Sequence, residues 1–120
     1  MSTQSIEKRC VLLCKGVPTR DWYAWNNLML PKPDDFHVIG EVQVSNPGVL
    51  AMLYPKEPQG INPDILLLDL ILVQQPGIWP QVVTWVTARY DKILFNSTFK
   101  NVEIFCEDKK IVDITVRDIH

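Results

Sequence analysis

The side chain best placed to do chemistry in this sequence is Asp69, which interrupts a long apolar run. Residues 65–73 are aliphatic except for this one acid. A buried carboxylate costs several kcal/mol unless it is paired, and it then has a raised pKa or a cationic partner. Arg89 is the candidate cation, and an Asp69–Arg89 pair would mark a candidate site. The interpretation that we favour is a structural acid that meets water or a backbone amide on a partly covered face.

Tryptophans beside polar side chains form the second set of candidate residues. The chain has 4 tryptophans, of which Trp22 and Trp25 follow Arg20 closely and Trp79 lies in a proline-flanked loop. Tryptophan and arginine dominate the binding energy of many protein interfaces. Arg20, Trp22, Trp25 and Trp79 are therefore candidate partner-binding residues, together with Asp69 and Arg89. The alternative for each tryptophan is packing with its N–H bonded at an edge, which we favour for Trp85.

Motifs for catalysis or metal binding are missing from the sequence. It contains no G-x-S-x-G, P-loop, G-x-G-x-x-G or H-E-x-x-H pattern. The histidines are His37 and His120, and the cysteines are Cys10, Cys14 and Cys106. This is a poor set for zinc, which usually takes four ligands in close pairs. We therefore expect no catalytic residue, no metal and no cofactor.

Composition narrows the class of protein. The 120 residues carry a net charge of -2 and are 47% hydrophobic, which fits a single globular domain over residues 1–120. The sequence has no basic stripe of the kind that indicates nucleic-acid binding. It also has no basic amphipathic helix and no run of ~20 apolar residues, either of which would indicate a membrane partner. The polar N-terminus does not look like a secretory leader. With an odd number of cysteines, these features predict three reduced thiols and a cytoplasmic location.

Short alternating segments, separated by Pro, Gly and Asn, predict an all-β fold. About seven strands are expected at the spacing typical of a sandwich or barrel. They cover residues 9–14, 36–44, 49–54, 65–73, 81–90, 100–107 and 110–119, with a hairpin turn over residues 107–110. The run at 65–73 has one wholly apolar face and should be a central strand. We predict an antiparallel two-sheet β-sandwich, and the alternative is a small closed β-barrel.

One short helix is expected near residues 20–30. Trp22, Trp25 and Met29 would then share a face, Thr19 could cap the start, and Pro31 would end it. An irregular loop held by its tryptophans is the alternative for this segment.

Three functions are compatible with these features. The favoured one is a non-catalytic binding or assembly module that acts through protein–protein contacts, and we expect it to form a homodimer through uncovered strand edges. The first alternative is a small-molecule-binding β-barrel, with or without enzymatic activity, that has Asp69 and Trp85 in its lumen. The second is an inhibitor-like module that presents the proline-rich loop at residues 55–63 to another protein.

Overall fold

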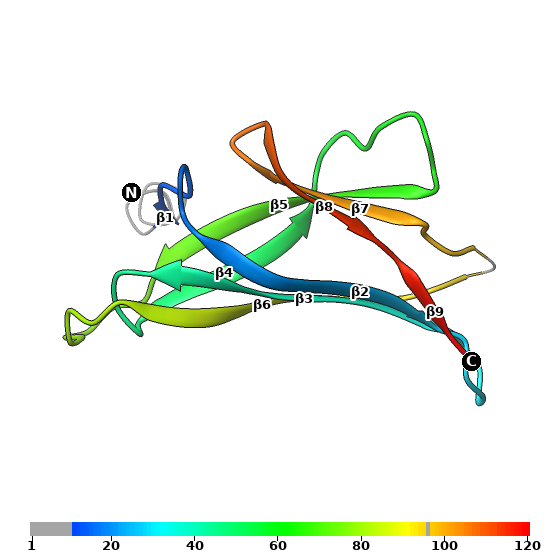
Figure 1. Ribbon diagram of the computed structural model, residues 1–120, viewed down its shortest axis with the longest axis horizontal. Coiled ribbons are helices and arrows are strands. Elements are labelled where there is room, and N and C mark those ends of the chain that lie inside the picture. Colours follow the sequence, from blue (N-terminus) through cyan, green and yellow to red (C-terminus); the bar gives the residue numbers. More distant parts are fainter. Residues whose placement is uncertain (1–10, 96) are drawn as a thin grey trace, which may run out of the picture.

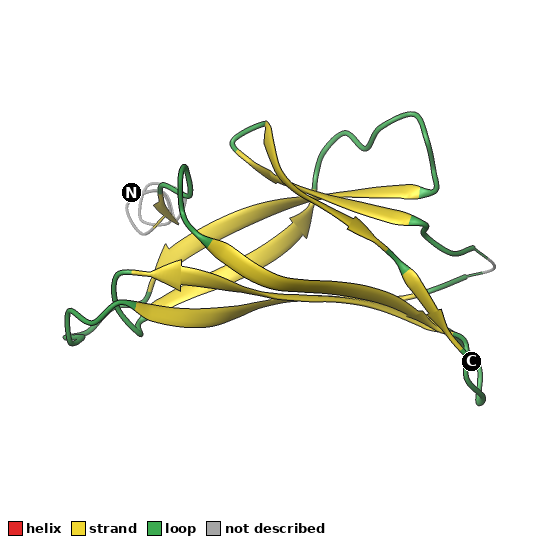
Figure 2. Ribbon diagram, in the orientation of Figure 1, coloured by secondary structure: helices red, strands yellow, loops and turns green. Residues whose placement is uncertain are grey.

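In the computed structural model, residues 11–95 and 97–120 are described, and they form two β-sheets that face each other across one hydrophobic core (Figure 1). The regular elements of these residues are all strands (Figure 2). They are β1 (Val11–Leu12), β2 (Thr19–Asn27), β3 (Asp35–Val44), β4 (Val49–Pro55), β5 (Ile65–Gln74), β6 (Thr84–Ile93), β7 (Asn101–Cys106), β8 (Lys109–Thr115) and β9 (Arg117–Ile119). The predicted all-β sandwich is confirmed. No helix of the described part is long and apolar enough to span a membrane.

Each sheet is open at both ends. In sheet A, β4 pairs with one side of β5, while β7 and β1 pair with its other side and β8 follows β7. Sheet B has the order β6-β3-β2-β9. No described strand joins the two sheets into a closed ring, so the barrel alternative is wrong. The predicted antiparallel arrangement holds except for the parallel pairs β5–β7 and β2–β9.

The core forms between the inner faces of β5 and β3. Alternate leucines of β5 face inward and are at most 5% exposed: Leu66, Leu68, Leu70 and Leu72. They meet buried side chains of β3, including Phe36, Val38 and Val42. The prediction of a central strand with one wholly apolar face is confirmed. Its second face is less covered than expected, because Ile65, Leu67, Ile71 and Val73 stay half-buried.

The segment expected to be helical is strand β2, so that prediction is wrong. Asp21 has a φ of 58° and lies in a bulge between Arg20 and Tyr23. An extra residue in a strand bends it and resets the alternation of its side chains. Beyond the bulge, Trp25 pairs with His37 on the outer face of sheet B. Trp22 packs inward over Gly40, where a Cβ atom would lie 2.2 Å from Cε3 of the indole.

The expected hairpin between residues 107 and 110 is confirmed in a tighter form. β7 and β8 pair antiparallel, and Glu107 and Asp108 connect them with φ values of 50° and 70°. Two consecutive positive φ values are typical of the type I′ turn that matches the twist of a hairpin. The segment at 110–119, expected to be one strand, divides after Thr115: β8 stays in sheet A and β9 joins sheet B.

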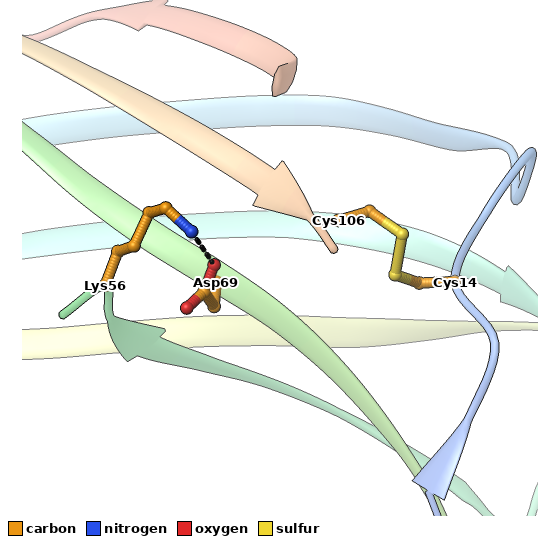
Figure 3. The surroundings of a disulfide bond; sticks show 4 residues. All are labelled: Cys14, Lys56, Asp69 and Cys106. Carbon is orange, nitrogen blue, oxygen red and sulfur yellow. Dashed lines mark hydrogen bonds and ion pairs between the residues drawn. A yellow bond between two sulfur atoms is a disulfide. The ribbon is translucent and has the colours of Figure 1, made fainter. Parts of the chain in front are cut away.

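A disulfide bond joins Cys14 to Cys106, so the expectation of three free thiols is wrong (Figure 3). Cys14 follows β1 and Cys106 ends β7, and the two side chains are 5% and 4% exposed. The third cysteine, Cys10, lies outside the described residues. The bond therefore connects the segment after β1 to the end of β7, the strand that pairs with residues 65–69 of β5.

Candidate functional site

Asp69 pairs with Lys56 and not with Arg89, so the alternative in which Asp69 and Arg89 form a pair is wrong. The carboxylate projects from the outer face of β5, is 33% exposed, and accepts a hydrogen bond from Nζ of Lys56 at 3.4 Å (Figure 3). Arg89 lies on β6 in the other sheet, where its Nε binds Asp91 at 2.9 Å. A partly exposed pair of this kind is a structural contact rather than a buried site of high energy.

Lys56 also donates to Asp108 in the β7–β8 turn. The hydrogen bond to Asp108 is the largest influence on the pKa of Lys56, and together with Asp69 it raises that pKa although partial burial opposes it. The ammonium group therefore stays charged at neutral pH. A pocket of about 270 Å³, lined in part by Asp69, Ile71 and Val11, opens beside this pair. Lys56 thus links the outer face of β5 to the β7–β8 turn through two carboxylates.

On β4 and β5, most side chains on the outer face of sheet A are apolar. The pairing of β4 with β5 places Leu50 opposite Val73 and Met52 opposite Ile71, so these four side chains project to the same side. We call the surface made by Leu50, Met52, Tyr54, Ile65, Leu67, Ile71 and Val73 the apolar face. Leu50 is 44% exposed and Tyr54 is 45% exposed, while the other members are half-buried. Leu50, Met52, Ile71 and Val73 adjoin one another, and Asp69 separates them from Ile65 and Leu67. Adjoining apolar residues on a surface are more informative than scattered ones.

The outer face of sheet B carries arginines stacked on aromatic rings. The guanidinium of Arg20 lies 3.8 Å from the ring centroid of Trp85, and its Nε donates to Glu41 at 3.0 Å. Further along, the ring of Trp25 lies 5.2 Å from that of Tyr23. Three of the predicted candidates, Arg20, Trp25 and Arg89, thus share one surface. Trp85, for which packing was favoured, lies half-buried beneath Arg20.

His37 is held in the same surface by two carboxylates. Its Nδ1 meets Asp91 at 2.5 Å and its Nε2 meets Asp35. Partial burial tends to raise the pKa of Asp91, but hydrogen bonds from Arg89 and His37 outweigh this and lower it. Both ring nitrogens of His37 therefore already have a carboxylate partner.

The remaining two predicted tryptophans, Trp22 and Trp79, each pack against a glycine. Trp22 lies against the core beside Gly40, and its Nε1 is buried with no hydrogen-bond partner among the described residues. Trp79 packs against Gly48 and donates its Nε1 to the carbonyl of Gln75 at 3.0 Å. Both indoles are half-buried and packed against a glycine, so these contacts agree with the packing alternative, while a role in partner binding stays a prediction.

The loop at residues 55–63 is held by one of its own side chains. Gln59 donates from Nε2 to the carbonyls of Lys56 and Leu67 at 2.7 and 2.8 Å, and its Oε1 accepts from the backbone N–H of Leu67 at 2.9 Å. The amide group thereby takes the place of a strand residue beside β5. At the far end of the loop, the side chain of Ile61 is fully exposed.

Sequence reasoning missed Lys56, Glu41 and Asp91, which complete the charge pairs on the two outer faces. No motif marks them, and only the register between strands brings them to their partners. Among the described residues, no group of three or more His, Cys, Asp or Glu side chains could hold a metal ion. Comparisons with protein families, curated proteins and solved structures give no significant match. The chemistry of its own residues is therefore the basis for assigning a function.

Proposed function

We propose that this protein is a non-catalytic binding module that contacts another protein through the apolar face of sheet A. The observation that carries the proposal is the row of aliphatic side chains on β4 and β5 that no described residue fully covers. Covering the exposed part of Leu50 alone would contribute about 1 kcal/mol. Several such residues side by side provide the apolar centre that a protein interface requires.

The surroundings of this face favour a protein over a small ligand. The side chains project from a sheet surface, whereas small-molecule sites are concave and enclose most of the ligand. The inner faces of the sheets are filled by the core, so the lumen required by the small-molecule alternative is absent from the described part. The Lys56–Asp69 pair next to Ile71 gives a polar feature that fixes the orientation of a partner.

Site-specific photo-crosslinking tests this proposal. A photoreactive phenylalanine analogue at Leu50 should capture a partner from native extract in a saturable manner, so that excess unlabelled protein competes for it. The same probe at Ile78, which is fully exposed in the loop between β5 and β6, is the matched control. Capture that is equal at both positions, or that excess unlabelled protein does not reduce, would rule out the apolar face as the binding surface.

One observation favours the inhibitor-like alternative as a second candidate. The loop at 55–63 is both exposed and held to β5 through Gln59, and it presents the fully exposed Ile61. A rigid loop binds with a smaller entropic cost than a mobile one. If the loop is the contact, a photoreactive probe in the loop should capture a partner. Ile61→Ala, with Gln59 kept, should then abolish this capture and leave capture at Leu50 unchanged.

A cytoplasmic location stays a prediction. The bond between Cys14 and Cys106 weakens it, because disulfides persist mainly in oxidising compartments. Trapping thiols in intact source cells before lysis would decide the redox state of the two cysteines in their native compartment.

A further inference from the structure

Strand β6 is the end strand of sheet B, and β4 of sheet A packs close to it. It pairs with β3 over ten residues without a register shift. Just beyond it, the N–H of Leu94 donates to the carbonyl of Asp34 at 2.9 Å. The N–H and C=O groups of successive residues in a strand point to opposite sides. Since Leu94 bonds toward β3, the backbone groups of residues 84, 86, 88, 90 and 92 also bond to β3. The N–H and C=O groups of Thr87, Arg89 and Asp91 then point away from the sheet, and no described residue binds them.

The sequence of β6 is complementary to itself when two copies run antiparallel. With a two-fold axis at Tyr90, Arg89 lies opposite Asp91 of the second copy, and Asp91 lies opposite its Arg89. Centring the axis on Arg89 or on Asp91 instead would place like charges directly opposite each other, which is unfavourable. With the axis at Tyr90, the outward N–H and C=O groups of Arg89 also face those of Asp91 in the second copy, as the hydrogen bonds of an antiparallel pair require. On the same side, Thr87 lies opposite Ile93, which is 51% exposed in the single chain.

We propose that two copies of this chain pair through their β6 edges, antiparallel and with the two-fold axis at Tyr90. The two four-stranded sheets then form one continuous sheet of eight strands, since each copy contributes four. This pairing satisfies the backbone groups of β6 that no described residue binds, and natural proteins rarely leave the edge of a long strand unpaired. It does not rest on the proposed function, because the apolar face lies on sheet A and the pairing strand belongs to sheet B.

Cysteine cross-linking reads out the register directly. In a Cys10→Ser background, Tyr90→Cys places two thiols opposite each other at a non-hydrogen-bonded pair, about 4.5 Å apart between Cα atoms, which is within disulfide range. We expect a dimer on a non-reducing gel after mild oxidation. The matched control is Lys92→Cys on the same side of β6, which would lie opposite Ala88 and about 13 Å from its own twin. Absence of the Tyr90 cross-link, or an equal yield at Lys92, would overturn the proposed register.

Charge exchange provides a second test that does not depend on the fit of a new cysteine. Arg89→Asp and Asp91→Arg should each be monomeric by light scattering at concentrations where the wild type is a dimer. Mixing the two variants should restore a dimer, since every cross-strand pair then has opposite charges. Lys109→Asp, in the β7–β8 hairpin, is the control that changes an exposed charge away from the edge. A monomeric wild type at 100 µM, or single variants that remain dimeric, would contradict the proposal, while capture at Leu50 would still test the apolar face separately.

Discussion

Removing the bond between Cys14 and Cys106 should lower the free energy of unfolding by about 4–5 kcal/mol. The two cysteines are 92 residues apart in the sequence. In the chain-entropy treatment, closing a loop of this length removes about 16 cal/mol/K from the unfolded ensemble, which is about 4.6 kcal/mol at 25 °C. Typical domains have a total stability of only about 5–15 kcal/mol, so the reduced protein should be marginally stable.

Urea denaturation of three samples measures this loss: the oxidised wild type, the wild type in reductant, and a Cys14→Ser/Cys106→Ser variant. We expect the last two to unfold at similar, much lower urea concentrations. The buried serines can add a modest further loss, since both side chains are nearly fully buried. A loss below about 1 kcal/mol on reduction would refute the entropic reasoning. Finding three free thiols in the denatured, unreduced protein would refute the bond itself.

Three further substitutions test the core and the charge pairs. Leu68→Ala, at a fully buried position, should cost about 2–5 kcal/mol in urea denaturation, whereas Leu50→Ala on the exposed side of β4 should cost less than about 1 kcal/mol. Gly40→Ala should lower stability by roughly 1–3 kcal/mol because its methyl group would collide with Trp22, and a second change, Trp22→Leu, should recover part of that loss. Asp91 has a lowered pKa in the folded state, so its stabilising contribution is present above its unfolded value, near 3.8, and is lost as the pH falls through the folded value. The stability difference between wild type and Asp91→Asn should therefore be seen at neutral pH and disappear in acid; a difference that persists unchanged at pH 2 would contradict this.

The fold was predictable where period-two alternation was uninterrupted. The alternate leucines of β5 could belong only to a buried strand face, and the structure buries all of them. In β2 the bulge at Asp21 breaks the alternation. Trp22 in the bulge and Trp25 after it are three residues apart, a spacing that also suits a helix. A local irregularity that depends on one positive φ leaves little trace in the sequence, since Asp occurs in many other contexts.

Pairings across the sandwich were the part of the site that the sequence could not predict. Asp69 and Arg89 are both on well-defined strands, but those strands belong to different sheets, and each residue finds its partner elsewhere. The disulfide was hidden for a related reason. The odd number of cysteines and the polar N-terminus predicted reduced thiols, whereas Cys14 bonds to Cys106 across 92 residues. Such contacts follow from strand order, which alternation does not specify.

Binding measurements with variants of the apolar face test the central claim most directly. The protein captured through Leu50 would be titrated with wild type, with Leu50→Glu and with the control Ile78→Glu, after circular dichroism has shown that all three are folded. We predict that Leu50→Glu weakens binding at least tenfold, because it places a charge within the apolar interface, and that Ile78→Glu binds like the wild type. Equal affinities for all three proteins would show that the apolar face is not the binding surface.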